Sequence, residues 1–123
     1  MIVVGLGWQK AALASNALEL VVGSLEKAGV PVPAYIAAPD FKKEDILPQA
    51  VAEMLGAEVL WINPLALQQM QACCQTFSTT VSQHVGVASV AEACALAGAG
   101  QGSFLRLPRQ AFCGVTCAIA EGD

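Results

Sequence analysis

Apolar residues along the first third of the chain form two patterns, short continuous runs and positions at helical spacing. The run Ile2–Leu6 predicts a buried strand, and a second strand is predicted at Tyr35–Ala38. Between them, apolar residues recur as they do on one face of an amphipathic helix, and Gly29 follows as a C-cap. These apolar positions are Leu13, Ala17, Leu20, Val21, Leu25 and Ala28. The pattern therefore predicts a strand–helix–strand unit.

The alternation continues through the middle of the chain. After a charged loop at Asp40–Asp45, Pro48 suits the first turn of a helix that Gly56 ends. That helix carries Val51, Met54 and Leu55. A third strand is predicted at Val59–Ile62, and Asn63-Pro64 starts another helix with asparagine as its cap. This helix carries Leu67, Met70 and Cys74.

Two further helical segments are expected before the chain turns to strands. Ser78–His84 has room for one or two helical turns. Ser89–Glu92 matches a capping box, in which the serine hydroxyl and the glutamate carboxylate each accept a backbone N–H at the helix start. This helix runs to Leu96, and the glycines of Gly98–Gly102 stop it.

The chain closes on two predicted strands, Phe104–Leu107 and Val115–Ala120, joined around Gly114. Pro108 places the first of them at an edge or an end of the sheet. The complete order is β-α-β-α-β-α-α-β-β. It predicts a single α/β domain over residues 1–123, with a mixed sheet that has a parallel βαβαβ portion, a C-terminal antiparallel hairpin, and helices on both faces.

Composition and charge narrow the class of protein. The chain is 55% hydrophobic and 13% charged, which excludes intrinsic disorder. No apolar run reaches the roughly 18 residues of a membrane helix, and no basic segment precedes the N-terminal apolar run. We therefore expect a cytoplasmic protein with no membrane partner. The net charge of −4 argues against nucleic acid as a partner.

The five cysteines form no recognisable disulfide or zinc framework, because their number is odd and no second pair or histidine stands at ligand spacing. We expect buried free thiols in a reducing cytosol, with no bound metal and no cofactor. The cysteines are Cys73, Cys74, Cys94, Cys113 and Cys117. Gly5-Leu6-Gly7 lacks the third glycine of the dinucleotide fingerprint, which argues against a nicotinamide or flavin nucleotide.

The few cations follow the predicted parallel strands. Lys10 comes after the first strand, and Lys42 and Lys43 come after the second. Ligands of open α/β sheets bind beyond the carboxyl ends of such strands, so these lysines indicate a site for an anionic small molecule. Gly5-Leu6-Gly7, expected at a turn, could add backbone N–H groups to that site. Ordinary solvated loop lysines explain the pattern equally well.

Acidic and aromatic candidates stand beside these cations. Asp40, Glu44 or Asp45 could act as a general base, although mixed-charge loops are more often simply solvated. Glu92 is a candidate acid, with the capping box as its structural alternative. Trp8 could stack on a planar ligand or pack in the core. His84 stands at no catalytic spacing to a serine or cysteine, so we favour a structural or surface role for it.

Four segments together resemble the CobE / CbiG C-terminal family of cobalamin (vitamin B12) biosynthesis, from one end of the chain to the other. The first is the glycine turn Gly5–Ala11, and the second is the charged loop Asp40–Asp45. The third, Val85–Leu96, matches a V-G-x-x-S-V-A-E-A-x-A-L pattern closely. The fourth is the ending, Leu105–Arg109 with Val115–Ala120.

The resemblance implies a role in building the corrin ring. Fused members of the family open a lactone on a cobalt-precorrin intermediate and release acetaldehyde, whereas stand-alone members belong to the aerobic route. The expected ligand is a carboxylate-rich corrin precursor, bound by Gly5, Gly7, Trp8, Lys10, Asp40, Lys42, Lys43 and Arg109. Two alternatives stay open, a precorrin hydrolase or isomerase that uses Asp40, Glu44 or Glu92, and an adaptor for other enzymes of the pathway.

The first turn departs from the family pattern. The family cysteine is replaced by Trp8, its first basic residue by Gln9, and its closing glycine by Ala11. The small hydroxyl residue that would follow is Ala12, so the first helix loses its expected cap, a change that costs ~1 kcal/mol. We therefore expect binding through the remaining cations and a loss of part of any catalysis that depends on this turn.

Overall fold

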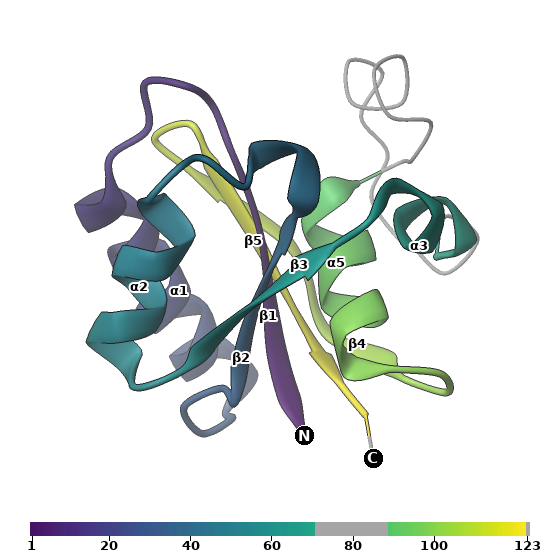
Figure 1. The fold of residues 1–123 in the computed structure, drawn as a ribbon. Helices are drawn as coiled ribbons and strands as arrows, with labels where there is room; N and C mark the ends of the chain where they lie inside the picture. The colour runs from purple at the N-terminus through teal and green to yellow at the C-terminus, as the bar shows by residue number, and fades with distance from the viewer. Residues whose placement is uncertain (71–88, 123) are drawn as a thin grey trace.

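A computed structural model describes residues 1–70 and 89–122 of the chain. Its centre is a five-stranded sheet in the order β3-β2-β1-β5-β4 (Figure 1). The strands are β1 (Ile2–Trp8), β2 (Tyr35–Pro39), β3 (Glu58–Ile62), β4 (Phe104–Phe112) and β5 (Val115–Glu121). The helices are α1 (Ala14–Ala28), the 3₁₀ turn η1 (Asp40–Lys42), α2 (Leu47–Leu55), α3 (Pro64–Gln69) and α5 (Val90–Ala99).

The sheet is mixed, as the sequence predicts. β1 pairs in parallel with β2, and β2 pairs in parallel with β3, while β5 pairs antiparallel with both β1 and β4. Helices α1 and α2 cover one face, and α3 and α5 cover the other (Figure 1). The predicted fold class is confirmed. The predicted segment Ser78–His84 and the residues Cys73 and Cys74 lie outside the described part of the chain.

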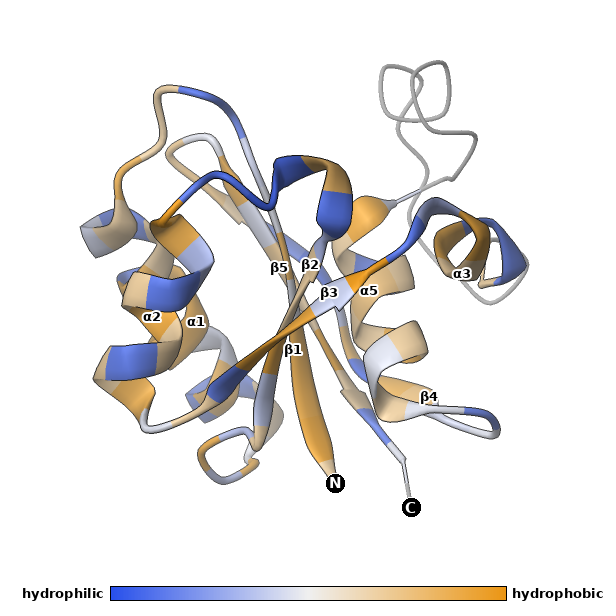
Figure 2. Cartoon of the chain, in the orientation of Figure 1, coloured by the Kyte–Doolittle hydropathy of each residue, from blue (hydrophilic) through white to orange (hydrophobic). Residues whose placement is uncertain are grey.

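Two apolar cores, one on each face, hold the layers together. The β1 side chains alternate between them, with Val3 on the α5 side and Val4 and Leu6 on the α1 and α2 side, all three fully buried. This alternation is the two-residue period of a strand buried on both faces. Figure 2 shows β1 in hydrophobic colours between the two layers of helices.

The predicted helix ends agree with the structure at most positions. Gly29 and Gly56 adopt left-handed φ angles of 68° and 70° after α1 and α2, as expected of C-caps. The Asn63 side chain accepts the Ala66 N–H at 2.8 Å, and the Ser89 hydroxyl accepts the Glu92 N–H at 3.3 Å. The caps of α3 and α5 are therefore the ones that the sequence indicates.

β4 is longer than predicted, since it continues through Pro108 to Phe112. Register irregularities between Leu105 and Leu107 and between Leu107 and Gln110 take up the residues that do not fit the ladder. Pro108 has no N–H to donate to a neighbouring strand. The sheet tolerates this because β4 is an edge strand, with a neighbour on one side only. The edge position predicted from Pro108 is confirmed.

The first helix has no side-chain cap. Its N-cap is Leu13, 60% exposed and extended (φ −101°, ψ 140°), which is one position later than the resemblance indicates. We expect Leu13→Ser to stabilise the protein by ~1 kcal/mol, because a serine hydroxyl at this position can accept a first-turn N–H. Urea unfolding measures the change. Ala12→Ser is the matched control, and an equal gain from that variant would contradict the assignment of Leu13 as N-cap.

Candidate functional site

The carboxyl ends of β1, β2 and β3 form one edge of the sheet, at the residues Trp8, Pro39 and Ile62. Helices α1 and α2 follow parallel strands, so they also begin at this edge (Figure 1). Lys10 leads from β1 towards α1, and η1 leads from β2 towards α2 with Lys42 as its last residue. The fold therefore places the predicted lysines at the predicted edge.

Trp8 is the centre of a polar network at this edge. Its indole N–H donates to a carboxylate oxygen of Asp45 at 2.8 Å, and the Lys42 ammonium lies 4.8 Å from the centroid of its ring. Lys42 also donates a hydrogen bond to the Trp8 backbone carbonyl. The network thus connects the end of β1 to η1 and the loop after it, which we call the η1 loop. Lys42 and Asp45 lie 34 and 37 residues from Trp8 in the sequence.

Trp8 belongs to the core rather than to an open surface. Only 6% of the residue is exposed, and it packs in the cluster beneath α1 and α2. Its ring is therefore covered in this structure and presents no free face for stacking. Burial lowers the pKa of Lys42 from its usual 10.5, and the Asp45 carboxylate partly offsets this effect. Sequence reasoning missed the role of Asp45, although the carboxylate follows Lys42 by three residues.

Lys10 and Lys43 differ from Lys42, because both are exposed and neither side chain forms a hydrogen bond, ring contact or ion pair within residues 1–70 and 89–122. Two features lie beside them, of which the sequence predicted only the missing cap of α1. The N-caps of α1 and α2, Leu13 and Ile46, provide no side-chain cap, so first-turn N–H groups of both helices lack that partner. Both residues are also exposed hydrophobic side chains, at 60% and 77%, as is Phe41 at 49%.

The glycines of the first motif are not in a turn, contrary to the sequence prediction. β1 runs to Trp8, and Gly5 and Gly7 pair with Ala118 and Thr116 of β5. A Cβ on Gly5 would lie 2.0 Å from the Ala91 carbonyl oxygen of α5. The absent side chain therefore lets α5 pack closely on the sheet, which explains this glycine without any ligand.

Glu92 lies on the other face of the sheet from Trp8, where it contacts the backbone of Arg109 in β4. Glu92, in the first turn of α5, is fully buried, and one of its carboxylate oxygens accepts the backbone N–H of Arg109 at 2.9 Å. The bond meets β4 where its register is irregular, between Leu107 and Gln110. Glu92 and the Arg109 backbone therefore form a contact separate from the network around Trp8.

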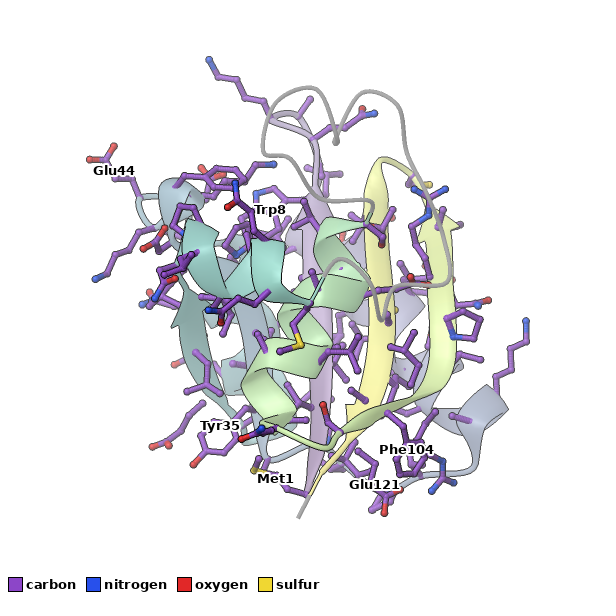
Figure 3. The ribbon with its side chains drawn as sticks, turned by 90° about the vertical axis from the view of Figure 1, so that its right-hand side faces the viewer. Met1, Trp8, Tyr35, Glu44, Phe104 and Glu121 are labelled. Atoms are coloured by element: carbon purple, nitrogen blue, oxygen red, sulfur yellow. The ribbon has the colours of Figure 1, made fainter. Side chains whose placement is uncertain are left out.

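The remaining candidates are placed as follows. Asp40 is half-buried at the start of η1, and Glu44 is exposed (Figure 3). His84 lies outside the described residues. Cys94 and Cys117 are buried, as expected, whereas Cys113 is exposed in the β4–β5 turn.

Burial raises the pKa of the Cys117 thiol to about 11, and the thiol donates to the Ser24 hydroxyl at 3.2 Å. In the part of the chain that the structure describes, no cluster of histidine, cysteine or acidic side chains could hold a metal ion. None of the helices described there is long and apolar enough to cross a bilayer.

The fold and this edge define a small α/β domain with a mixed sheet and with exposed lysines and apolar side chains where its parallel strands end. Residues 2–120 match the protein family described as cobalamin synthesis G C-terminus. The chain therefore belongs to this family, and it is a protein of cobalamin biosynthesis. Among curated proteins, none matches the sequence.

Solved structures agree with the family assignment. CobE, a protein from the cobalamin (vitamin B12) biosynthetic pathway, superimposes with a TM-score of 0.90 at 24% identity, over 98% of this chain and 89% of that one. Cobalamin biosynthesis protein chiG from Agrobacterium tumefaciens superimposes with a TM-score of 0.79 at 29% identity, over 100% of this chain and 99% of that one. A cobalamin biosynthesis protein G homologue from Sulfolobus solfataricus gives 0.67 at 20% identity, over 97% of this chain and 36% of that one.

Proposed function

We propose that this protein is a cytoplasmic binding protein of cobalamin biosynthesis that holds a carboxylate-rich corrin precursor at the carboxyl edge of its parallel strands. One observation carries the proposal. An acidic chain of net charge −4 places Lys10, Lys42 and Lys43, half of its six cations, at that one edge. Of these three lysines, Lys10 and Lys43 are exposed and form no ion pair with the described residues, so both are available for carboxylates.

The chemistry of the edge matches the chemistry of such a ligand. A corrin precursor has an apolar macrocycle with carboxylates around its rim. The exposed side chains of Leu13, Phe41 and Ile46 offer apolar contact, while the lysines and the two uncapped helix starts favour negative charge. The half-buried Lys42 and the buried Trp8 support this surface, because they hold the η1 loop against β1.

Titration with a cobalt-free corrin that bears free carboxylates tests the proposal, and its amidated form serves as the matched ligand. We expect a shift of the visible absorption band and quenching of Trp8, observed alone in a Trp61→Phe background. Lys10→Ala and Lys43→Ala should each weaken binding about two- to fivefold at low salt, and together roughly tenfold. Added salt should weaken binding further.

Arg106→Ala is the matched control for the loss of one positive charge. Arg106 pairs with Glu121, which lies opposite Ile2 at the amino end of β1, far from the proposed site. This variant should bind as the wild type does. The proposal fails if the carboxylate corrin gives neither optical signal at low salt, or if Arg106→Ala weakens binding as much as the lysine variants do.

One observation favours an enzyme as the second candidate. Asp40 is half-buried directly at the end of β2, where a carboxylate could act as a base on a ligand held by the lysines. A precorrin hydrolase or isomerase would then convert the bound ligand, with a change of mass or release of acetaldehyde. Asp40→Asn should abolish that turnover while binding remains, whereas turnover that survives this substitution would exclude Asp40.

A further inference from the structure

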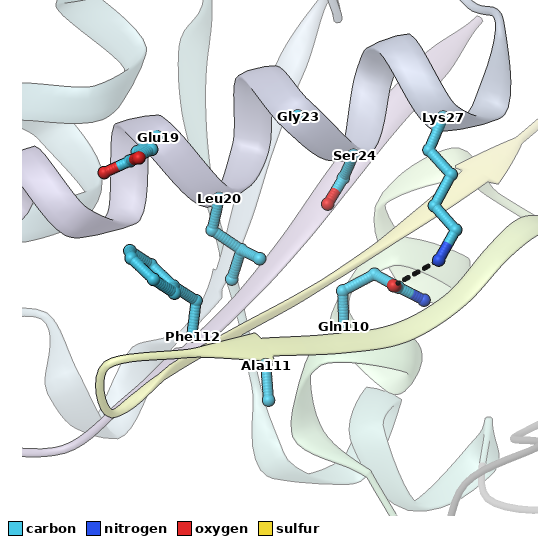
Figure 4. Close-up of a pocket in the computed structure, with 8 residues that line it drawn as sticks. All are labelled: Glu19, Leu20, Gly23, Ser24, Lys27, Gln110, Ala111 and Phe112. Carbon is cyan, nitrogen blue, oxygen red and sulfur yellow. Dashed lines mark hydrogen bonds between the residues drawn. The ribbon is translucent and has the colours of Figure 1, made fainter.

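An open groove of about 280 Å³ runs between α1 and the edge strand β4 (Figure 4). We call it the α1–β4 groove. Leu20 and Ser24 of α1 and Phe112 of β4 line it, and Phe112 is 39% exposed beside Leu20. Its charged residues, Glu19 and Lys27, stand at opposite ends of the groove on α1 (Figure 4). The groove thus joins an exposed aromatic ring to two opposite charges.

Gly23 lies midway between these charges. Residues four apart share one face of a helix, so Glu19, Gly23 and Lys27 form a line along α1. The chain's own packing does not require this glycine, because a Cβ there would meet nothing within 4 Å, whereas at Gly98 it would meet Val3 at 2.9 Å. A glycine inside a helix is unfavourable compared with alanine. What Gly23 does provide is a shallow depression where a second helix can approach closely.

We propose that the α1–β4 groove is the interface of a homodimer in which the α1 helices of two copies cross at Gly23. A two-fold axis through Gly23 brings position 19 of each copy opposite position 27 of the other. Glu19 of each copy then meets Lys27 of the other, so one such pair stands at each end of the contact. Glu19 has no ion pair within the described residues, and Lys27 is already oriented by a 3.2 Å hydrogen bond to Gln110.

The charge order identifies the occupant as a second copy of this chain. A negative and a positive side chain at equal distances from the depression are complementary to themselves after a two-fold rotation. An anionic ligand that fills the groove would meet Glu19 at one end, and a cationic ligand that fills it would meet Lys27 at the other. The crossing would also cover part of the exposed Phe112 ring and the apolar side chain of Leu20.

Sedimentation equilibrium of the purified full chain, with charge-swapped variants, tests the interface. We expect a reversible monomer–dimer equilibrium for the wild type. Glu19→Lys and Lys27→Glu should each weaken dimerisation roughly tenfold, because each places like charges together at both ends of the contact. The double variant restores opposite charges in reverse order, so its dimer should return to within about twofold of the wild type.

Gly23→Gln separates the interface from the stability of the monomer. Glutamine is a better helix former than glycine, so the monomer should unfold at the same or a higher urea concentration. Its side chain fills the depression, so dimerisation should be lost. A wild-type chain that stays monomeric at every concentration overturns the proposal, and so does a double charge variant that dimerises no better than the single ones. Corrin binding at Lys10 and Lys43 is a separate measurement, and its result does not affect this one.

Discussion

Gly5→Ala is expected to destabilise the protein by more than ~3 kcal/mol, a large part of the stability of an ordinary small domain. A Cβ at this position would lie 2.0 Å from the Ala91 carbonyl oxygen and 2.5 Å from the Ala95 nitrogen. Both contacts are backbone atoms of α5, so no side-chain rotation relieves them. The helix would have to move off the sheet and open the core around Val3.

Gly7→Ala is the matched control in the same strand. Its new Cβ would first meet the Thr116 hydroxyl oxygen at 2.7 Å, which is a side-chain atom, and the nearest α5 atoms would lie 4.0 Å away. We expect this variant to lose no more than ~1–2 kcal/mol, because the threonine side chain can rotate. Urea unfolding of both variants decides the matter. Equal losses would show that close packing of α5 is not what selects glycine at position 5.

The fold was predictable because local signals agree with it at nearly every element. The continuous apolar run at Ile2–Leu6 is that of a strand buried on both faces, and Gly29, Gly56 and Asn63 mark helix ends chemically. The main differences arise where tertiary contacts decide. β1 and β4 extend past their predicted ends because β5 offers both of them a ladder partner, which no local pattern reveals.

The candidate site was predictable only in part, and for a similar reason. The position of Lys10 and Lys43 follows from topology alone, since residues after parallel strands collect at one edge. Whether a side chain is available there depends on its partners. Lys42 and Trp8 engage each other and Asp45, and these contacts join residues more than 30 positions apart. The sequence pattern cannot distinguish the engaged lysine from the two exposed ones.

Glycine in the first motif shows how one pattern supports two interpretations. A G-x-G after an apolar run is typical of a phosphate-binding turn, and it is also what a strand needs where a helix backbone approaches closely. The structure places Gly5 and Gly7 inside β1, so the second interpretation explains Gly5. The proposed anion site therefore rests on lysines and on the starts of α1 and α2, not on this motif.

Glu92→Ala is expected to cost ~2–4 kcal/mol of stability, the sum of a lost hydrogen bond and a cavity. The Glu92 carboxylate is fully buried and accepts the Arg109 N–H at 2.9 Å, which connects α5 to the irregular part of β4. Without the Glu92 carboxylate, the Arg109 N–H has no acceptor from α5. Glu92→Gln keeps an acceptor oxygen of the same reach, so we expect a smaller loss of ~1–2 kcal/mol. Urea unfolding measures both.

Arg109→Ala distinguishes a structural Glu92 from one that acts on a ligand. The donor to Glu92 is the backbone of residue 109, so this substitution leaves the bond in place and should cost less than ~1 kcal/mol. If Glu92→Ala instead unfolds at the wild-type urea concentration and abolishes conversion of a corrin precursor, Glu92 is a reacting group and the structural role is wrong. We expect the wild type and Arg109→Ala to be the most stable, followed by Glu92→Gln and then Glu92→Ala. This order would identify the Glu92 carboxylate as the connection between α5 and the edge strand β4.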